Sequence, residues 1–414
     1  MDKHLHKDIP SYEEAKKIIL KNINPTETVY VSIKKALGNI ISQDIVATEN
    51  LPPFNNAAVD GYAVKIKNIQ GAAPDKPVLI DTLDDVPAGK LPATRLKTGT
   101  TVKVMTGAPV PEGTDAVVPL ELTESTYGNR IKVIGTVDEL ANIRFIGEDI
   151  QKGEVVLPAG TMVTSGNIGL LAALGLTEIP VLRRPRIGIL ASGDELIPID
   201  KPLQPGKIRN SNTYMLMALA QACNADIVNL GVAKDSISDI SNRIKKGDEA
   251  DIIVCTGGAS VGDRDFVKKA FKELNVDIKF TSVKQKPGKP LVFGIWEKRP
   301  VFALPGNPVS TFVSFVEYVI PVIKKMLDYP KTDFDMLPAT LHDDYKKPAG
   351  ITHFVRGICE LHADGSYTVK TTGNQSSGLM TSVAKANCII VFEEEAEHYK
   401  KGSKVFIHSL NFLV

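Results

Sequence analysis

The chain has 414 residues, of which 43% are hydrophobic and 23% charged, a composition that is ordinary for a soluble globular protein. Its length exceeds the size at which a single core usually splits, so we expect two to four domains. Lys and Arg (49) nearly balance Asp and Glu (48), which excludes a global positive field of the kind that attracts nucleic acid.

The start of the chain, residues 1–7, is polar and lacks the apolar core of a signal peptide. The sequence contains no run of about 18 apolar residues, so no membrane span is predicted. We therefore expect a cytoplasmic protein that binds neither a membrane nor nucleic acid. The four cysteines are widely scattered without a CxxC pair, which favours buried thiols over a zinc site or a disulfide framework.

Hydrophobic periodicity and turn residues divide the chain into regions of different character. Residues 11–23 predict a helix with Ser11 as N-cap and Glu14 at the capping-box position. From about 45 to 180, short strands alternate with Pro/Gly turns, which predicts a β-rich region of turns and small barrels.

Residues 181–330 alternate strands and helices at βαβ spacing, which predicts a three-layer α/β domain with a largely parallel sheet. Residues 331–414 return to β character. The predicted fold class is therefore multidomain, with a central α/β domain between β-rich N-terminal and C-terminal domains. The predicted strands of the α/β domain are 186–191, 226–231, 251–255, 291–295 and 300–304, and its predicted helices are 212–223, 236–247, 265–274 and 308–327.

Ligands of open parallel sheets bind outside the carboxyl ends of the strands. Four loops are predicted to meet there, and three of them contain acids. Helix capping explains any one of these acids by itself, but their grouping beside glycines favours a ligand site. The acids are Asp194, Glu195, Asp235, Asp263 and Asp265, and the fourth loop is Pro305-Gly306-Asn307-Pro308.

A lysine-containing turn, residues 284–290, precedes the predicted strand 291–295 and is expected to lie within reach of the same edge. Lys286 and Lys289 can hold an anion as point charges, although a solvated surface turn is the alternative. Lysines that face carboxylates indicate a phosphorylated ligand that arrives with a divalent cation.

Three further stretches in the N-terminal half combine acids, hydroxyls or an arginine with tight turns. They contain Asp60 in 51–63, Thr106 in 104–111, and Arg144 with Asp149 in 142–149. From the residues alone, each stretch fits turn chemistry as well as a binding role.

Seven segments together resemble the molybdopterin molybdenumtransferase family, which includes bacterial MoeA and the E domain of gephyrin. They occur in family order across nearly the whole chain. Where the family usually has Asp, Ser and Met, this chain has Asn55, Ala57 and Val59, while Asp60 is retained. The segments are PPFNNAAVDGYA (52–63), MTGAPVPEGTDAVV (105–118), NIRFIGEDIQKG (142–153), SGDEL (192–196), TGGASVGDRD (256–265), KPGKP (286–290) and LPGNPVS (304–310).

The resemblance implies a reaction in molybdenum cofactor biosynthesis. Molybdate is inserted into adenylylated molybdopterin, the pyrophosphate bond is cleaved, and molybdenum cofactor and AMP are released with Mg²⁺ or another divalent cation. It also implies a homodimer with the site at the subunit interface, and contact with molybdopterin adenylyltransferase and molybdoenzyme-maturation proteins. The domains implied are 1–45 with 147–180, 46–146, a molybdopterin-binding domain at 181–330, and 331–414.

The resemblance also implies roles for residues at matching positions. A serine of the segment 376–377 is expected near the site, and Ser376 is our choice. The predicted catalytic residues are Asp60, Thr106, Asp265, Lys286 and Lys289, and the predicted metal ligands are Asp60, Asp265 and Glu195. The predicted substrate-binding residues are Arg144, Asp149, Ser192, Gly193, Glu195, Asp235, Gly257, Gly258, Ser260, Pro305, Gly306, Pro308 and Ser376.

In our mechanistic hypothesis, Lys286 and Lys289 neutralise the charge that develops on the leaving AMP phosphate, and molybdate binds near Arg144 and the Thr106 turn. Two other functions remain open. A molybdopterin adenylyltransferase shares the α/β domain but is about one domain long, whereas this chain has the additional motifs of residues 52–153. A non-catalytic scaffold would not need to retain the acids and lysines.

Overall fold

The computed structural model describes residues 9–257 and 265–410, and the chain forms two compact units. The larger unit comprises Met1–Val29, Gly38–Ile40 and Val181–Val414, and the smaller unit comprises Tyr30–Leu37 and Ile41–Pro180. No helix in the described part of the chain is long and apolar enough to cross a membrane.

The smaller unit is built on a six-stranded sheet in the order β7-β4-β6-β5-β9-β8. Val64, Val102, Val104 and Val117 are completely buried in it, which agrees with the predicted β-rich region. Its strands are β4 (Gly61–Val64), β5 (Val78–Val86), β6 (Thr100–Val104), β7 (Ala116–Pro119), β8 (Thr123–Ser125) and β9 (Arg130–Val133).

Shorter elements complete the smaller unit, in which β2 pairs with β11 and β3 with β10. The helix α2 (Ser165–Ala173) was not predicted, because its sequence is rich in glycine. It begins at Thr164, whose side chain accepts from the Asn167 amide in a capping box. The other elements are β2 (Ile45–Val46), β3 (Asn56–Ala57), β10 (Ile143–Arg144), β11 (Val155–Leu157) and the short 3₁₀ turns η1 (Ile33–Lys35), η2 (Ile66–Asn68) and η3 (Leu120–Leu122). The paired strands β1 (Thr28–Ser32) and β12 (Glu178–Leu182) each include residues of both units.

The larger unit contains the predicted α/β domain, whose sheet has the order β16-β13-β17-β21-β20-β18. The first four strands are parallel, whereas β20 is antiparallel to both of its neighbours, β21 and β18. Only Glu297 and Lys298, both with positive φ, connect β20 to β21, and so short a connection requires antiparallel strands. The strands are β13 (Arg186–Ser192), β16 (Asp226–Ala233), β17 (Ile252–Thr256), β18 (Asp277–Ser282), β20 (Pro290–Trp296) and β21 (Arg299–Leu304).

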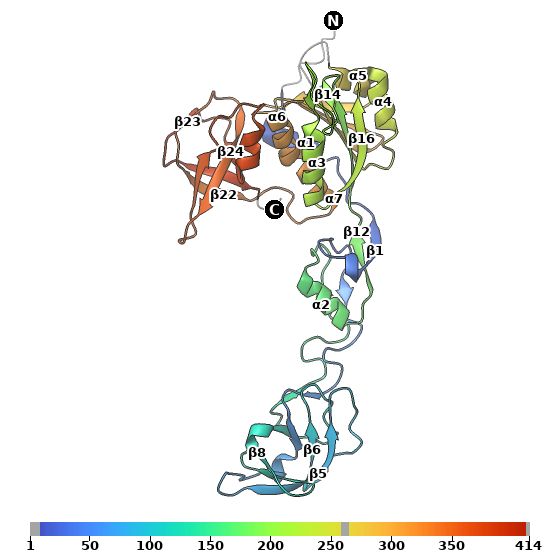
Figure 1. Ribbon diagram of the computed structural model, residues 1–414, viewed down its shortest axis with the longest axis vertical. Helices are drawn as coiled ribbons and strands as arrows, with labels where there is room; N and C mark the ends of the chain where they lie inside the picture. Colours follow the sequence, from blue (N-terminus) through green and yellow to red (C-terminus); the bar gives the residue numbers. More distant parts are fainter. Residues whose placement is uncertain (1–8, 258–264, 411–414) are drawn as a thin grey trace. The chain divides into compact units, whose positions relative to one another are not determined.

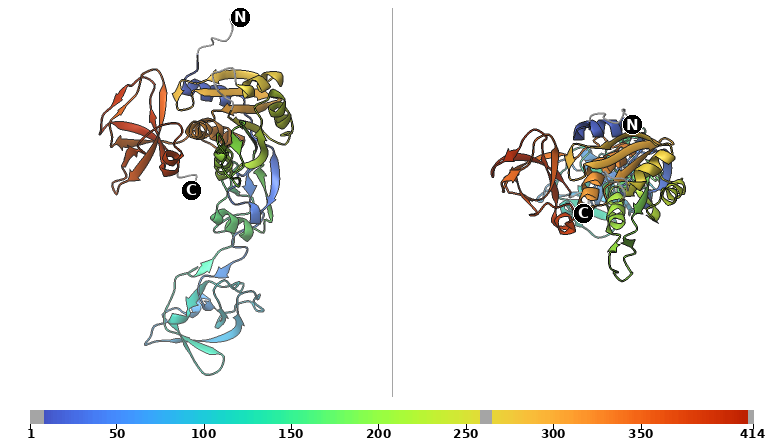
Figure 2. Two further views of the ribbon diagram at one scale, coloured as in Figure 1. Left: turned by 45° about the horizontal axis from the view of Figure 1, so that its top comes forward. Right: turned by 90° about the horizontal axis from the view of Figure 1, so that it is seen from above.

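Helices cover both faces of this sheet and confirm the predicted three layers (Figures 1 and 2). Side chains of β17 alternate between two cores: Ile252 and Val254 pack with α3 and α6, whereas Ile253 and Cys255 pack with α4 and α5. The predicted strands and helices are therefore confirmed here to within a few residues. The helices are α3 (Ser211–Ala222), α4 (Ile237–Lys245), α5 (Phe266–Glu273) and α6 (Pro308–Ser314).

The predicted helix 308–327 exists but contains one π-helical turn. It consists of α6, the π-helix η4 (Phe315–Val319) and α7 (Ile320–Met326), and nearly all of its side chains are buried. The predicted N-terminal helix is α1 (Tyr12–Leu20), with the expected capping box between Ser11 and Glu14. It packs on the long helix through Tyr12 and Ile19.

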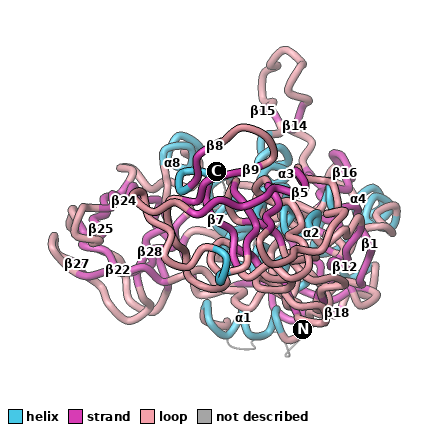
Figure 3. Tube along the Cα trace, turned by 90° about the horizontal axis from the view of Figure 1, so that it is seen from below, coloured by secondary structure: helices cyan, strands magenta, loops and turns pink. Residues whose placement is uncertain are grey.

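The C-terminal strands form a sheet in the order β19-β24-β25-β22-β28-β26, and a further pairing of β24 with β26 closes a ring (Figure 2). The short strand β19 (Gln285–Lys286) belongs to the lysine segment and pairs with β24. The loop between β14 (Leu196–Ile197) and β15 (Ile208–Arg209) projects from the α/β domain (Figure 3). The C-terminal elements are β22 (Met336–Leu341), β23 (Tyr345–Lys346), β24 (Thr352–Leu361), β25 (Tyr367–Thr371), α8 (Met380–Lys385), β26 (Cys388–Phe392), β27 (His398–Tyr399) and β28 (Lys404–Ser409).

An ion-pair network braces the amino end of the α/β sheet. Both terminal nitrogens of Arg183 donate to Asp251, each at 2.8 Å, and the Arg186 amide donates to the same carboxylate at 2.7 Å. Arg183 also pairs with Glu27. Because the Arg183 and Asp251 side chains are only 21% and 25% exposed, these bonds are partly shielded from water.

Asp251→Asn removes the charge that three donors share, and we expect it to lower the free energy of unfolding of this unit by about 2 kcal/mol. The measurement is urea unfolding followed through Trp296, the only tryptophan, which is 7% exposed in β20. Glu249→Gln is the matched control, because its pair with Arg186 is exposed and 3.7 Å long. Equal midpoints for the two variants would contradict the structural role of Asp251.

Candidate functional site

The loops that follow the parallel strands meet closely at the carboxyl edge of the sheet. Gly257 has a φ of +89°, and a Cβ added to it would lie 2.2 Å from the carbonyl oxygen of Ser192, so only glycine allows this approach. The Ser192 hydroxyl lies 3.3 Å from Asp235 Oδ1, and the Asp235 amide donates to Asp194 Oδ1 at 3.3 Å. The structure therefore brings together the loops that the sequence predicted to converge.

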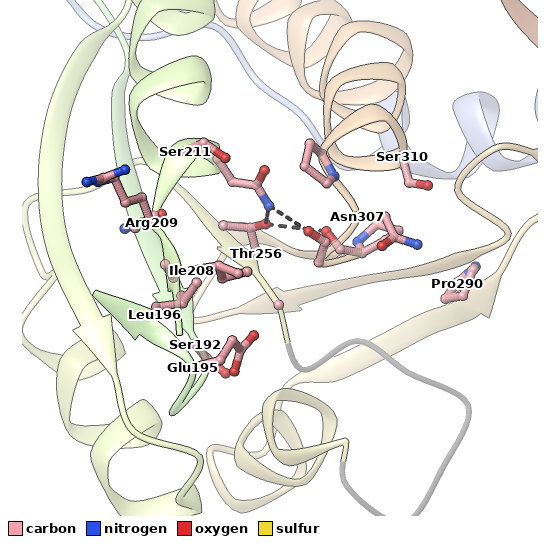
Figure 4. A pocket seen from close by; sticks show the side chains of 17 residues that line it. Ser192, Glu195, Leu196, Ile208, Arg209, Ser211, Thr256, Pro290, Asn307 and Ser310 are labelled. Carbon is pink, nitrogen blue, oxygen red and sulfur yellow. Dashed lines mark hydrogen bonds between the residues drawn. The ribbon is translucent and has the colours of Figure 1, made fainter. Parts of the chain in front are cut away.

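These loops enclose a first cavity of about 490 Å³ (Figure 4). Asn212, at the start of α3, connects two of these loops: its side-chain amide donates to the Gly306 carbonyl at 2.9 Å and to the Thr256 hydroxyl at 3.0 Å. Several predicted substrate-binding residues line this cavity, together with Asn307 of the predicted fourth loop and with Arg209 and Asn212, which the sequence analysis missed. The predicted residues that line it are Ser192, Glu195, Gly257, Pro305, Gly306 and Pro308.

A second cavity of about 580 Å³ lies between the lysine segment and the C-terminal strands. It shares Pro290 and Ser310 with the first cavity, so the two adjoin. The predicted residues Lys286, Lys289 and Ser376 all line it, and the structure thus groups them around one space.

The start of α6 is hydrogen-bonded to the C-terminal segment that lines this second cavity. The side-chain amide of Asn307 donates to the Ser377 hydroxyl at 3.1 Å, and the backbone N–H of Val309 donates to the Ser377 carbonyl at 3.2 Å. Of the two serines left open by the sequence, Ser376 is exposed in the second cavity and Ser377 is half-buried. Ser377 therefore has a structural role as well as a place in the lining.

Arg356 is a lining residue of the second cavity that the sequence analysis missed. It is 1% exposed, its Nε donates to Ser382 at 3.2 Å and its Nη2 to the Ser376 carbonyl at 3.5 Å. Burial lowers the pKa of its guanidinium to about 10, which leaves it charged at neutral pH. Within residues 9–257 and 265–410, no carboxylate forms an ion pair with it. An arginine inside the apolar run Phe354–Ile358 was the available signal.

His353 lies beside the same cavity and is 2% exposed. Its Nδ1 is 3.0 Å from the Tyr345 hydroxyl, while its Nε2 has no hydrogen-bond partner within the described residues. Burial first, then the charges of Lys286 and Lys347, lower the pKa of this imidazole to about 4. The ring is therefore neutral at pH 7 and adds no charge to the cavity.

Among the predicted metal ligands of the larger unit, Glu195 is exposed in the first cavity and Asp265 is 8% exposed. Asp265 Oδ1 accepts from the Lys268 amide at 2.9 Å and caps α5, and burial raises the pKa of its carboxyl. No group of three or more His, Cys, Asp or Glu side chains suited to a metal occurs in the part of the chain that is described. The metal role of these acids therefore stays a prediction.

In the smaller unit, the structure brings Asp60 and Thr106 together. The amide and the hydroxyl of Thr106 both donate to Asp60 Oδ1 at 2.7 Å, and these two bonds lower the pKa of the carboxyl. Oδ2 takes part in neither bond. Arg144 and Asp149 are exposed, and within the described residues neither hydrogen-bonds to this pair. The predicted residues Gly258 and Ser260 lie outside the described residues.

The last predicted residue, Gly193, contributes its backbone to these loops. The Gly193 amide donates to the Ala233 carbonyl at 3.3 Å, and Gly193 has a φ of +153°. A Cβ on Gly193 would lie 2.6 Å from a Glu195 carboxylate oxygen, so the absence of a side chain lets Glu195 fold back over the loop. Gly193 therefore shapes the position of Glu195.

Together, the fold and the two cavities define a multidomain α/β protein suited to a polar, anionic small molecule at the carboxyl edge of its sheet. Its residues 10–175 match the MoeA N-terminal region (domain I and II), residues 188–325 a probable molybdopterin binding domain, and residues 338–410 the MoeA C-terminal region (domain IV).

Similar proteins extend over nearly the whole chain. A Haemophilus influenzae protein named molybdopterin molybdenumtransferase is 34% identical over 94% of this chain and 96% of its own length. A Bacillus subtilis protein of the same name is 34% identical over 92% and 89%. The crystal structure of the molybdopterin biosynthesis moeA protein from Pyrococcus horikoshii OT3 is 32% identical with a TM-score of 0.80, over 97% of this chain and 100% of its own. This chain belongs to the MoeA family of molybdopterin molybdenumtransferases.

The low pKa of His353 predicts a pH-dependent loss of stability. Between pH 6.5 and about 4 the unfolded chain protonates this imidazole and the native protein does not, so stability falls as the pH falls through this window. We expect His353→Gln to flatten the decrease of the melting temperature between pH 7.5 and 4.5.

The measurement is the melting temperature of both proteins across this range, because carboxylates common to both cancel in the difference. His362→Gln, a change at an exposed histidine that bonds Thr368, is the control and should follow the unsubstituted protein. If the His353→Gln curve ran parallel to that of the unsubstituted protein, the buried neutral ring would not be the cause.

Proposed function

We propose that this protein inserts molybdate into adenylylated molybdopterin, cleaving the pyrophosphate bond and releasing molybdenum cofactor and AMP. The relatives named molybdopterin molybdenumtransferase, which match nearly the whole chain, support this reaction. The structural observation that supports it best is the pair of adjoining cavities. The first is lined mainly by neutral polar groups with Glu195 and Arg209, and the second by three cationic side chains.

The first cavity suits the heterocyclic part of the substrate. Asn212, Asn307 and Ser192 offer amide and hydroxyl groups to the heterocycle, and Glu195 lies in the same cavity as a carboxylate for substrate or cation. Glycines in the surrounding loops allow a ligand to approach the backbone. Binding here would direct the charged part of the substrate toward the second cavity across Pro290 and Ser310.

The second cavity suits a tetrahedral oxyanion. Lys286, Lys289 and Arg356 surround it, and Arg356 has no carboxylate partner among the described residues. An anion would therefore compensate a buried charge as well as two exposed ones. In this proposal the lysines neutralise the leaving AMP phosphate, while Arg144 and the Thr106 turn receive molybdate.

The proposed catalytic acids divide between the two units, Asp60 in the smaller and Asp265 in the larger. We propose a homodimer in which the smaller unit of one subunit completes the site of its partner, and four domains with the boundaries predicted above. Carboxylate oxygens suit Mg²⁺ or another divalent cation, which commonly takes only one or two protein carboxylates beside substrate phosphates. Asp60, Asp265 and Glu195 would hold it, and when bound it would neutralise pyrophosphate charge.

The chain's own residues prepare this chemistry. Thr106 keeps Asp60 ionised and fixes its orientation, and the lysines stabilise charge that develops on the leaving group. The nucleophilic oxygen belongs to the substrate or the oxyanion, so no protein nucleophile is needed. We propose a cytoplasmic location and an exchange of substrate with a molybdopterin adenylyltransferase and with molybdoenzyme-maturation proteins.

The reaction is tested by AMP release from adenylylated molybdopterin, with purified protein and Mg²⁺, in the presence and absence of molybdate. We expect AMP release that depends on molybdate. Tight binding of the nucleotide without AMP release would instead favour a delivery or scaffold role. ATP-dependent adenylylation of molybdopterin would favour an adenylyltransferase.

Asp60→Ala removes the carboxylate that Thr106 orients, and we expect turnover to fall by about 100-fold. Folding should be intact, because Asp60 is exposed. Asp75→Ala, an exposed turn aspartate of the same unit, is the control. The assignment of Asp60 would be wrong if both variants released AMP at the rate of the unsubstituted protein.

A further inference from the structure

Two buried, uncharged side chains hold the lysine segment: Gln285, within the segment itself, and Tyr318 of the long helix. Gln285, which is 1% exposed, folds its amide back over the turn that follows it. Its Nε2 donates to the carbonyl oxygen of Pro287 at 3.1 Å and to that of Gly288 at 3.2 Å. These two residues separate Lys286 from Lys289, so one amide fixes the backbone between both lysines.

The second side chain is Tyr318 in the π-helix η4, which is completely buried. Its hydroxyl donates to Gln285 Oε1. The amide of Gln285 is therefore held in a single orientation, since its oxygen accepts from Tyr318 while its nitrogen donates to the two carbonyls. A π-turn inside a long helix is frequent at functional sites, and here it contains the residue that reaches the turn.

The turn also packs directly against the helix that precedes η4. Gly288 has a φ of +85°, and a Cβ added to it would lie 2.6 Å from the hydroxyl of Ser314, the last residue of α6. On its other side, the strand β19 continues into the pairing of Lys286 with His353. The backbone of the lysine segment is thus held by the helix on one side and by β24 on the other.

We propose that Gln285 and Tyr318 are positioning residues, which hold the backbone so that Lys286 and Lys289 both reach the oxyanion in the second cavity. The inference rests on the proposed role of the two lysines. Lysine side chains lose considerable rotamer freedom when they bind, and a mobile backbone would add to that loss. A fixed turn lowers the entropic cost of forming both contacts at once.

The chain contains a matched control for this proposal. Tyr12 is also a buried tyrosine, and its ring lies 5.8 Å from that of Tyr318. Its hydroxyl donates to Glu317, the residue next to Tyr318, at 2.7 Å. Tyr12→Phe and Tyr318→Phe therefore remove the same group from the same core, but only Tyr318 contacts the lysine turn through Gln285.

We expect both variants to lower the melting temperature, because each leaves a buried acceptor without its donor. Tyr12→Phe should lower it at least as much, because the Tyr12 hydroxyl also accepts from Lys16 at 3.1 Å. Only Tyr318→Phe should weaken anion binding, by about tenfold, the effect of one such hydrogen bond. The measurement is isothermal titration calorimetry of the full-length protein with AMP and, separately, with molybdate. Weaker binding of either anion supports the proposal and identifies which anion the lysines hold.

Lys289→Ala separates this inference from the function on which it rests. If Lys289→Ala binds AMP and molybdate as tightly as the unsubstituted protein, the role of the lysines is wrong. If Lys289→Ala loses binding while Tyr318→Phe binds as tightly as Tyr12→Phe, the lysine role holds and the positioning role is overturned. Gln285→Met, which keeps the side-chain length without the amide, decides the question in the same way if Tyr318→Phe does not fold.

Discussion

The second cavity depends on one short parallel pairing between distant parts of the chain. Gln285 pairs with Thr352 and Lys286 with His353, and the Thr352 amide also donates to the Lys284 carbonyl at 3.0 Å. This pairing attaches the lysine segment of the α/β domain to the C-terminal strands. Together with the bonds of Ser377 to the start of α6, it holds the lysine segment and Arg356 around one space.

The charges around the site explain why such a link is needed. Arg356 is buried without a carboxylate partner in the described parts of the chain, an arrangement that costs free energy until an anion compensates it. His353 reduces this cost because burial and nearby lysines keep it neutral. The acids Glu195 and Asp265 belong to other loops of the same edge, and Asp60 belongs to the smaller unit. The second cavity is thus lined by cations without a carboxylate, which suits a substrate that is itself a polyanion.

The parts of the fold that follow from local patterns could be predicted from the sequence. The capping box of Ser11 and Glu14, the alternating strands and helices, and the loops at the carboxyl edge all depend on neighbours within a few residues. The antiparallel direction of β20 and the helix α2 were not predicted, because a two-residue turn sets the first and the glycines of α2 conceal the second. The π-turn of the long helix adds only one residue per turn and leaves the apolar pattern unchanged.

The site was predicted less completely than the fold, and for a physical reason. Lys286, Lys289 and Ser376 were found because motif and composition marked them, but their grouping depends on contacts between residues some 70 to 90 positions apart. Arg356 was marked only by its place in an apolar run, and no local pattern displays its hydrogen bonds or those of Asn212 to other loops. Asp265 is both a helix cap and a candidate ligand, and the sequence alone does not separate these roles.

The π-turn of the long helix contains two buried polar side chains, Glu317 and Tyr318. Glu317 accepts from Tyr12 of α1 and lies 3.0 Å from His408 of β28, so it connects the N-terminal helix with the C-terminal strands. Its neighbour Tyr318 bonds Gln285 instead. Two consecutive side chains therefore each have hydrogen-bond partners on different segments inside an apolar core, where an unpaired polar group would cost free energy. The same turn that joins the domains thus also fixes the segment that bears the lysines, so the order of the proposed anion site follows from the packing of the core.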